Sequence, residues 1–472
     1  MQTPYPRDMI GYGATPPHAQ WPNAARIALQ FVINYEEGGE NNILHGDEAS
    51  EAFLSEIVGA QPWVGQRHMN MESIYEYGSR SGFWRLHHMF TQRAIPVTVF
   101  GVAMAMQRNP DCVQAMRDAQ WEIATHGLKW IDYRSVAPDI EQAHIQQAIA
   151  IQHNLTGARP LGIYQGRTSE QTLALSMADG GFLYSADSYA DELPYWVEGP
   201  YGPHLIVPYT LDANDMRFAT PQGFNTGEQF YTYLKDSFDC LYAEGATAPK
   251  MLSVGLHCRL VGRPGRAQAL ARFLDYVKSF PDVWCATRLE IARHWITHHK
   301  PAAGYVPAHL SRALFCAVYG SVYEHSPWIA EAVCEGPRGP SVTTAQELSA
   351  RMRTVVDQAS RQQQLDLINA HPDLSGKLAQ AKLLTAESTA EQASAGLDHL
   401  TAEERARFEA LNNAYKQKFG FVFILAVRGK TKADILTTFQ RRLSNTPAEE
   451  FQEALQQIHI IALLRMQTVL GT

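Results

Sequence analysis

Short apolar runs alternate with helical patterns through the first 300 residues of the chain. A start signal for a helix stands at Asn109 and Pro110, and residues 140–149 carry apolar positions at helical spacing. Strands that alternate with helices in this way are typical of βα units and predict a parallel sheet or barrel. The apolar runs predict strands at residues 27–33, 96–100, 121–125, 161–164, 182–185, 205–209 and 251–256.

From about residue 311 the pattern becomes helical and stays so. A capping box at residues 344–347 precedes apolar positions that share one helix face. A second helix is expected to begin at Thr401 and to end at Gly420, and a third to begin at Thr446 and Pro447.

The change of pattern near residue 300 predicts two unlike domains. We expect an α/β domain over residues 1–300, a linker over 301–310 and an all-α domain over 311–472. The length of 472 residues agrees, because a single domain commonly holds about 150 residues and a barrel about 250.

Composition and charge then exclude several classes of protein. A chain that is 45% hydrophobic and 19% charged can bury large cores, and its net charge of −8 argues against non-specific binding to nucleic acid or anionic membrane. The N-terminus lacks a secretory pattern, and no apolar run approaches the roughly 18 residues of a membrane span. The six cysteines lie far apart, which predicts reduced, mostly buried thiols. We therefore expect a cytoplasmic protein.

Polar residues follow the strands predicted in the first domain. In barrels of parallel strands, residues at the carboxyl ends of the strands form the site. Carboxylates beside histidines can activate water, and an arginine can bind an anionic or carbonyl oxygen. Each residue alone could equally be structural, and only its position selects it. These candidates are Glu36, Glu37, His126, Arg167 and His257.

The same residues carry a resemblance to the polysaccharide-deacetylase (NodB-homology) superfamily. Its T-F-D-D-G motif appears as Asn-Tyr-Glu-Glu-Gly at 34–38, and its H-S-x-x-H motif as His-Gly-Leu-Lys-Trp at 126–130. Its arginine-bearing motif matches residues 166–167, its D-S motif residues 187–188, and its L-x-H motif residues 255–257. The resemblance implies a deformed (β/α) barrel for the first domain.

The departures from that superfamily point to a subgroup. In the deacetylases the second aspartate and both histidines hold a divalent metal, whereas here the acids are Glu36 and Glu37 and the second histidine is Trp130. Tryptophan cannot ligate zinc. This pattern, and the stretch 68–85, are similar to the cofactor-independent allantoinases. The resemblance implies hydrolysis of the hydantoin ring of allantoin to allantoate with no metal.

Metal-free opening of a ring amide needs a base for water, donors for the oxyanion and an acid for the leaving nitrogen. We expect Glu36 to be the base, because it holds the position of the catalytic aspartate, although Glu37 stays open as an alternative. His257 is the expected acid, and His126 is expected to hydrogen-bond water or substrate.

Three further residues are expected to bind the substrate of the first domain. Arg167 would either orient Glu36 or bind a carbonyl oxygen. Glu37, if it is not the base, would bind ureido N–H groups. Trp130 would pack against the hydantoin plane, with core filling as the alternative.

Four strings in the second domain resemble the OHCU decarboxylases. They span residues 315–329, 370–374, 388–392 and 419–430, in that order. Members of this family act on 2-oxo-4-hydroxy-4-carboxy-5-ureidoimidazoline (OHCU) and release CO₂ to leave (S)-allantoin. The resemblance implies a helical fold of the same type for this domain.

The resemblance also implies the residues of this second site. Its catalytic histidine falls on His371, which can move the hydroxyl proton because histidine titrates near neutrality. Its active-site glutamate falls on Glu391, which would orient or charge that histidine. The ring delocalises the electrons that CO₂ leaves behind, so no cofactor is expected. The substrate-binding positions are Pro372, Ser388, Gln392, Ile424 and Arg428.

The two halves together predict a bifunctional enzyme of the ureide pathway of urate degradation. Its partners would be the small-molecule substrates OHCU and allantoin, with no nucleic acid and no membrane, and the relatives suggest a homo-oligomer. Two alternatives stay open. The first half could be a metal-dependent deacetylase of an acetylated sugar, or one half could be a non-catalytic module for ureide binding or oligomerisation.

Overall fold

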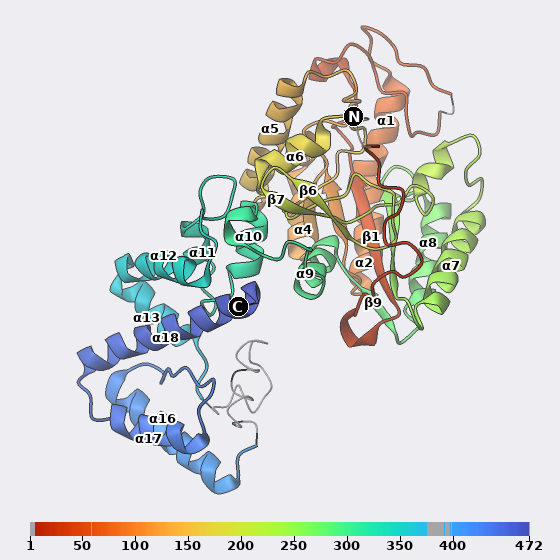
Figure 1. Cartoon of the computed structure of the whole chain (residues 1–472). Coiled ribbons are helices and arrows are strands. Elements are labelled where there is room, and N and C mark those ends of the chain that lie inside the picture. The colour runs from red at the N-terminus through yellow and green to blue at the C-terminus, as the bar shows by residue number, and fades with distance from the viewer. Residues whose placement is uncertain (1–4, 58, 375–390, 392–396, 398, 472) are drawn as a thin grey trace. The chain divides into compact units, whose positions relative to one another are not determined.

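A computed structural model shows two compact units, Met1–Lys300 and Pro301–Thr472 (Figure 1). Each unit is described by itself. Residues 301–310 belong to the second unit, in which Tyr305 and Leu310 are buried. The structure describes residues 5–57, 59–374, 391, 397 and 399–471.

Among the described residues, nine strands of the first unit form one sheet in the order β6-β7-β5-β4-β3-β2-β1-β8, and β9 also pairs with β1. All neighbours run parallel except β6 and β7. The deformed (β/α) barrel expected for this half is confirmed. The strands are β1 (Ile27–Tyr35), β2 (Thr98–Gly101), β3 (Glu122–Thr125), β4 (Gly162–Ile163), β5 (Tyr184–Ser185), β6 (Tyr195–Gly199), β7 (Gly202–Ile206), β8 (Lys250–His257) and β9 (Val283–Cys285).

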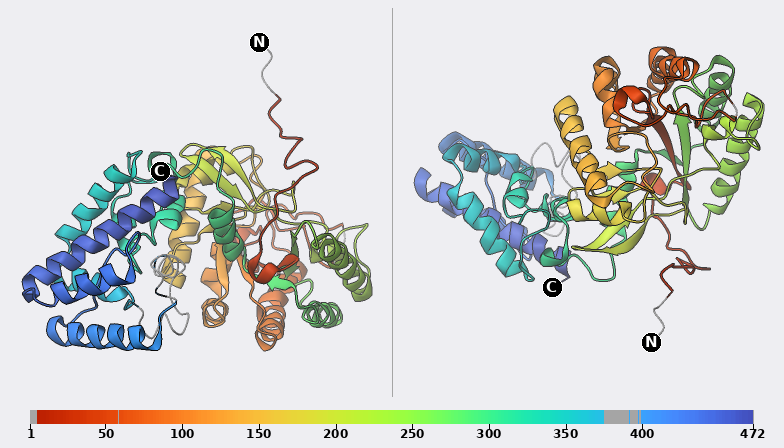
Figure 2. Two further views of the ribbon diagram at one scale, coloured as in Figure 1. Left: turned by 60° about the horizontal axis from the view of Figure 1, so that its bottom comes forward. Right: turned by 90° about the horizontal axis from the view of Figure 1, so that it is seen from above.

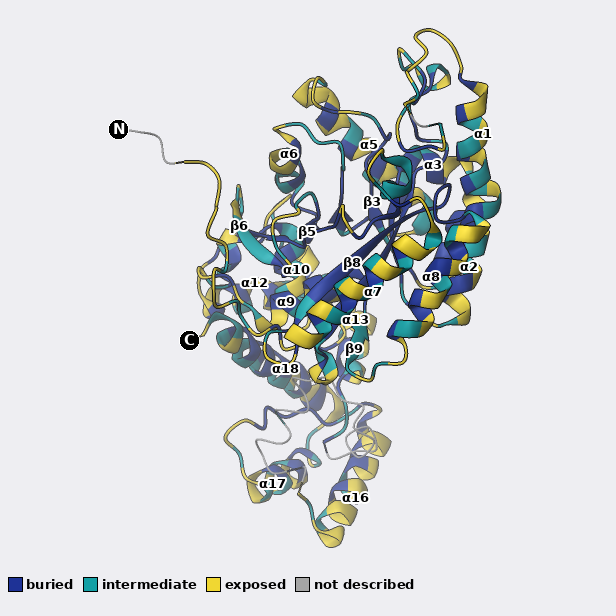
Figure 3. Cartoon of the chain, turned by 90° about the vertical axis from the view of Figure 1, so that its right-hand side faces the viewer, coloured by how far each residue is buried: buried dark blue, intermediate teal, exposed yellow. Residues whose placement is uncertain are grey.

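Helices surround this sheet (Figure 2). Figure 3 shows β8 buried while α7 and α8 turn exposed faces outward. The longer helices are α1 (Met69–Tyr77), α2 (Phe83–Gln92), α3 (Ala103–Arg108), α4 (Pro110–Asp118), α5 (Pro138–Thr156), α6 (Thr172–Asp179), α7 (Gly227–Glu244), α8 (Pro264–Val277) and α9 (Arg288–His298). Single turns are η1 (Pro22–Ala24), η2 (Ile43–His45), the π-helical η3 (Gly78–Gly82) and η4 (Asp215–Ala219).

The register of β1 determines where the strands of the first unit end. Every residue of β1 is buried, as expected for a central parallel strand covered on both faces. Tyr35 is aligned with Gly101 of β2, which is aligned with Thr125 of β3. On the other edge of β1, Asn34 is aligned with His257 of β8. The carboxyl ends of these strands therefore lie at one edge of the sheet, where the sequence places its candidate residues.

The second unit is helical throughout its described elements, as expected. The capping boxes at Thr344, Thr401 and Thr446 are confirmed, and Gly420 ends α16 in the left-handed conformation. Helix α18 packs against α12 and α13. The elements are η5 (Pro307–His309), α10 (Arg312–Tyr319), α11 (Trp328–Ala332), α12 (Ala345–Gln358), α13 (Arg361–Ala370), α16 (Ala402–Phe419), α17 (Lys432–Arg442) and α18 (Pro447–Leu470).

The cysteines differ in burial from the sequence expectation. All six are free thiols, but only Cys112 and Cys258 are buried, and Cys240 is exposed. The prediction of mostly buried thiols is therefore wrong, because most of these cysteines lie on partly exposed faces of helices or at strand edges. Within the part of the chain that the structure describes, no helix has the length and apolar character needed to cross a bilayer.

Candidate active sites

Three predicted residues of the first unit meet at the carboxyl edge of the sheet. Glu36 follows β1, His126 follows β3 and His257 ends β8, and each is at most 4% exposed. One carboxylate oxygen of Glu36, Oε1, lies 3.4 Å from Nε2 of His126 and 3.4 Å from Nε2 of His257. The parallel register thus brings one carboxylate between two imidazoles.

A cavity of about 270 Å³ opens above this group. Its lining includes Glu36, His126, Trp130, Arg167 and His257, which are five of the six residues predicted for this site. The sixth, Glu37, lies behind the cavity: its Oε1 accepts a hydrogen bond from the backbone N–H of Arg259 (3.1 Å).

Arg259 is a site residue that sequence reasoning missed. Its Nη2 donates to Oε2 of Glu36 at 2.7 Å, and its Nε donates to the carbonyl of Leu54 at 2.9 Å. One of the two roles expected for Arg167 is to orient Glu36. In the structure, Arg259 forms the ion pair with Glu36 instead. The only sequence signal is its position two residues after His257, at the end of a predicted strand.

Asp215 is the second residue that was missed. Its carboxylate accepts a hydrogen bond from Nδ1 of His257 at 2.6 Å, and it also accepts from the backbone N–H groups of His257 and Val261. A carboxylate can only accept from the ring nitrogen here, so His257 carries a proton on Nδ1 and directs Nε2 toward Glu36. Asp215 stands in the short helix η4, which no periodicity indicates.

Opposite charges set the protonation of this group. Burial alone would raise the pKa of Glu36, but the Arg259 guanidinium and His257 hold that pKa well below its ordinary value. Burial opposes the charged form of His257, yet the carboxylates of Glu36 and Asp215 raise the pKa of His257 to about 9. Near neutrality Glu36 is therefore a carboxylate and His257 an imidazolium.

Glu37 is buried beside Glu36. Burial raises its pKa above the ordinary value, despite the nearby Arg259 guanidinium. The π-helical turn between α1 and α2 packs directly on it, since a Cβ at Gly78 would come within 2.4 Å of its Oε1. Only glycine fits at position 78, which gives a physical reason for the glycines of the stretch 68–85.

Trp130 and Arg167 form one wall of the cavity. The guanidinium carbon of Arg167 lies 3.7 Å from the ring centroid of Trp130, and Phe53 stacks on the same indole at 6.0 Å. Arg167 also contacts the carboxylate of Glu51 at 3.4 Å. Trp130 is only 4% exposed and belongs to the hydrophobic core, so the wall offers chiefly the N–H donors of Arg167, which suit a ureide oxygen.

The D-S motif of the sequence supports the loop that carries Arg167. The Asp187 carboxylate accepts hydrogen bonds from the backbone N–H groups of Gln165 (2.8 Å) and Gly166 (2.7 Å). Gly166 has φ = +79°, and a Cβ there would lie 3.0 Å from Cε1 of His126. Asp187 thus holds a left-handed turn that brings the loop against His126.

The donor set of this site does not fit the divalent metal of the deacetylases. Trp130 replaces one histidine ligand, and both oxygens of Glu37 already accept backbone hydrogen bonds, from Glu36 (3.2 Å) and Arg259 (3.1 Å). Within the described ranges, no group of three or more His, Cys, Asp or Glu side chains is placed to hold a metal ion.

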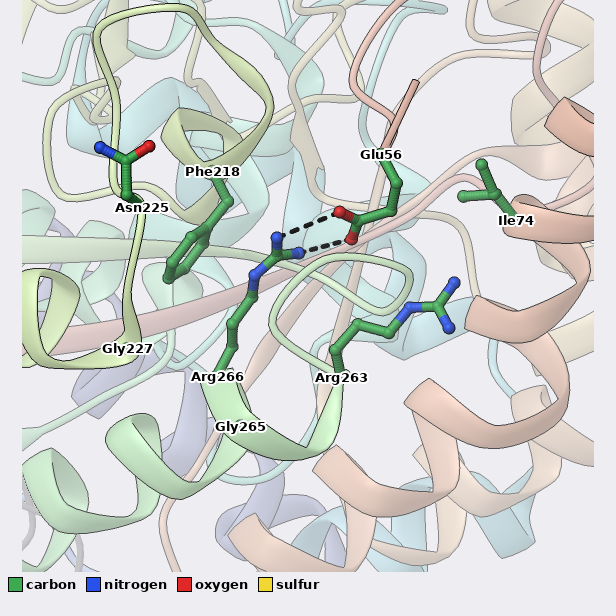
Figure 4. Close-up of a pocket in the computed structure, with 8 residues that line it drawn as sticks. All are labelled: Glu56, Ile74, Phe218, Asn225, Gly227, Arg263, Gly265 and Arg266. Atoms are coloured by element: carbon green, nitrogen blue, oxygen red, sulfur yellow. Dashed lines mark hydrogen bonds and ion pairs between the residues drawn. The ribbon is translucent and has the colours of Figure 1, made fainter. Parts of the chain in front are cut away.

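A second hollow of the first unit, of about 600 Å³, lies at the start of α8 (Figure 4). Arg266 forms two hydrogen bonds with Glu56, at 2.6 and 3.2 Å, which the figure marks with dashes. Arg263 and Asn225 also line it. None of the residues predicted for the active site lies there, so the predicted chemistry belongs to the cavity at Glu36.

In the second unit, His371 stands at the carboxyl end of α13. Its backbone N–H donates to Ile368, and its Nδ1 lies 3.0 Å from the carbonyl of Leu367. A carbonyl only accepts, so Nδ1 carries the proton and Nε2 keeps its lone pair. Burial lowers the pKa of His371 to about 4, below the near-neutral value expected from the sequence, so the imidazole is neutral near pH 7. Such a histidine can accept a proton.

Glu391 is held by an arginine that the sequence reasoning did not select. Nε of Arg465 donates to Oε1 of Glu391 at 2.8 Å, and Nη2 donates to Oε2 at 3.0 Å. On its other side, Nη1 of Arg465 donates to Glu324 at 2.8 Å. Arg465 lies on α18 between apolar residues. The sequence there predicts a charge that faces solvent, but Arg465 is only 6% exposed.

Most of these residues line one small cavity. Its volume is about 30 Å³, roughly that of one water molecule. The side chain of Arg428 instead contacts Thr468 at 3.4 Å, and Ser388 and Gln392 lie outside the described residues. The Ile424 carbonyl accepts a hydrogen bond from the buried Arg442 at 2.5 Å. The cavity lining includes His371, Pro372, Glu391, Ile424 and Arg465.

Comparison with known protein families finds two separate matches. The sequence model of the polysaccharide deacetylase family matches residues 70–175, and that of the OHCU decarboxylase family matches residues 308–467.

Relatives of each half are also known. A crystal structure of Puue allantoinase is 60% identical, with a TM-score of 0.63, and covers 63% of this chain and 99% of that chain. A Schizosaccharomyces pombe protein assigned to the polysaccharide deacetylases is 41% identical over 313 residues, covering 62% of this chain and 98% of its own. The 2-oxo-4-hydroxy-4-carboxy-5-ureidoimidazoline decarboxylase of Haloferax volcanii is 40% identical over 152 residues, covering 32% of this chain and 86% of its own.

Proposed function

The chain belongs to the polysaccharide deacetylase family through its first unit and to the OHCU decarboxylase family through its second, and on this premise we propose a bifunctional enzyme of urate degradation. The second unit decarboxylates OHCU to (S)-allantoin, and the first unit hydrolyses allantoin to allantoate. For the first unit, the proposal rests on one observation. The Glu36 carboxylate lies between two imidazoles in the lining of a cavity of about 270 Å³.

In the first site, Glu36 is the base that activates water. Glu36 lines the cavity, its Oε1 lies between the two imidazoles while Oε2 is held by Arg259, and its lowered pKa keeps it ionised. Glu36 takes a proton from water as the oxygen attacks the ring amide carbon. Glu37 lies behind the cavity and has a raised pKa, which supports Glu36 rather than Glu37 in this role.

His257 is the acid of the same reaction. As an imidazolium it donates the Nε2 proton to the leaving ring nitrogen while the C–N bond breaks, and Asp215 holds the ring through Nδ1. His126 holds the water or the developing oxyanion. Arg167 binds a carbonyl or ureido oxygen from the indole face of Trp130. One water is consumed, and the single product is an open-chain ureide that carries the new carboxylate.

In the second site, neutral His371 moves the proton of the substrate hydroxyl. The electrons of the breaking C–CO₂ bond enter the ring C=N group, whose nitrogen takes a proton from solvent. Nε2 of His371 accepts the hydroxyl proton and returns it to the ring carbon, which yields allantoin. Arg465 holds Glu391 beside this histidine in the cavity, and the other predicted residues would hold the substrate.

The first test is hydrolysis of racemic allantoin by the full chain after treatment with a chelator. We expect allantoate to form at the rate of the untreated protein, because the Arg259 guanidinium and the His257 imidazolium supply the positive charge of the site. Circular dichroism of the remaining allantoin would report whether the S form, the product of the second unit, is preferred. Activity that disappears and returns with zinc would contradict metal-free hydrolysis, and no turnover in either condition would contradict the allantoinase assignment.

The acid role of His257 predicts an alkaline limit for hydrolysis. Because the carboxylates of Glu36 and Asp215 raise the pKa of His257 to about 9, kcat/KM should be steady near neutrality. It should then fall about tenfold per pH unit above that pKa as the proton is lost. Removing one carboxylate with Asp215→Asn should shift this alkaline limb to lower pH. A limb that stays in place in Asp215→Asn would argue against His257 as the acid.

Two further proposals concern the location and the assembly of the protein. We propose a cytoplasmic location, which the wide spacing of the six cysteines along the sequence supports. We also propose a homo-oligomer, as the resemblance to both families implies. Light scattering of the purified full chain measures the number of subunits directly.

A further inference from the structure

The first unit carries a fully buried arginine beneath its active site. Arg259 is 0% exposed and donates to Glu36 at 2.7 Å, and its Nη1 lies 3.5 Å from Oε1 of Glu37. It is absent from the described lining of the cavity. We propose that the Arg259 guanidinium is a built-in cation that takes the place of a divalent metal ion in this site and positions Glu36 for catalysis.

The charges around Arg259 are those that would otherwise gather a metal. Two buried carboxylates beside imidazoles carry the oxygen and nitrogen donors that divalent ions use, but this set lacks the second histidine ligand. Burying the two acids without a cation would be very costly. The guanidinium of Arg259 lies against both acids. It is also within 5.2 Å of the ring centroid of Trp130, the residue that stands in place of the missing histidine ligand. The cation that neutralises the acids is therefore part of the chain itself.

The guanidinium is held in one orientation. Its Nε donates to the Leu54 carbonyl at 2.9 Å, and the ring of Tyr75 covers it with the centroid 4.2 Å from the guanidinium carbon. Nη1 donates no hydrogen bond to the described residues, so it faces Glu37 as a charge at 3.5 Å. A planar fork fixed at Nε and Nη2 is more rigid than a lysine ammonium would be.

This arrangement divides the work of the two Glu36 oxygens. Oε2 is bound to Arg259 and Oε1 is left toward His126 and His257, at 3.4 Å from each. Arg259 acts through Glu36 rather than on the substrate, so it is a positioning residue. Its loss should reduce kcat and leave KM nearly unchanged. This readout rests on the proposed hydrolysis of allantoin.

The kinetic test compares Arg259 variants of the full chain with a matched surface control. We expect Arg259→Met to lower kcat for allantoin hydrolysis about 100-fold with KM within about threefold, and Arg259→Lys to lower kcat about tenfold. The control Arg272→Met, on the exposed face of α8, should match the wild type. A kcat within about threefold of wild type in Arg259→Met would overturn the proposal. If that variant fails to fold, wild-type kcat in Arg259→Lys would overturn it equally.

A metal-binding test needs no turnover, so it separates this proposal from the allantoinase assignment. Trp130→His restores the histidine, and the double variant W130H/R259M also removes the guanidinium. Co²⁺ binding to untagged protein is measured by equilibrium dialysis and visible absorption. We expect the double variant to bind one Co²⁺ per chain more than the wild type does. At the same Co²⁺ concentration, W130H alone should bind no more Co²⁺ than the wild type. Equal Co²⁺ binding by W130H alone, or none by a folded double variant, would show that Arg259 does not occupy the metal position.

Discussion

Replacement of Glu36 by glutamine should reduce allantoin hydrolysis about 1,000-fold. The amide keeps the size of the side chain but cannot take a proton from water, and it loses the charge that Arg259 and the two imidazoles surround. Because the oxygen contact with Arg259 can persist in the amide, the fold of the first unit should survive. The rate of allantoate formation from allantoin is the measurement.

Two comparisons make this result specific. Glu228→Gln, an equivalent change on the exposed side of α7, should leave hydrolysis unchanged. Release of CO₂ from OHCU by the same E36Q protein should also be unchanged, because each compact unit holds its own site. Retained hydrolysis in E36Q would move the role of base away from Glu36, with Glu37 the next candidate.

Replacement of His371 by alanine should reduce CO₂ release from OHCU by about 1,000-fold. The neutral imidazole donates Nδ1–H to the Leu367 carbonyl, so the lone pair at Nε2 can accept the hydroxyl proton, and His371 lines the cavity. Its removal leaves a cavity at the end of α13 but takes away no buried charge, so the helical unit should remain folded. Freshly generated OHCU and detection of CO₂ give the rate.

The control for this variant is His309→Ala, which changes an exposed histidine of the same unit. It should match the wild type, and hydrolysis of allantoin should be normal in both variants. Rapid CO₂ release by His371→Ala would exclude His371 as the proton carrier. Loss of both activities in His371→Ala would instead indicate that the substitution disturbs the whole chain.

The sequence predicts one part of the first site because that part follows from local pattern. Glu36, His126 and His257 each follow an apolar run, and parallel pairing places the ends of such runs side by side. Strands β6 and β9 escape prediction because neither is a buried apolar run: β6 is a partly exposed antiparallel edge, and all three residues of β9 are only partly buried.

The missed residues owe their roles to partners far along the chain. Arg259 is 223 positions from Glu36, and no periodicity near it shows that a carboxylate will be buried beside it. The sequence around Arg465 similarly predicts a solvent-exposed charge on α18. In the structure its partners are Glu324 and Glu391, which lie 141 and 74 positions away along the chain. Buried ion pairs of this kind become recognisable only when the tertiary contacts are known.

The division of the chain at Lys300 and Pro301 has a consequence for metabolism. Two enzymes made from separate genes can be produced in any ratio, and a cell can adjust the level of their shared intermediate by changing expression of either one. A single polypeptide fixes the ratio of the two active sites at one to one in every molecule made. The steady level of allantoin then depends on the turnover numbers and affinities of the two sites, so selection on that level must act on the residues of the sites themselves.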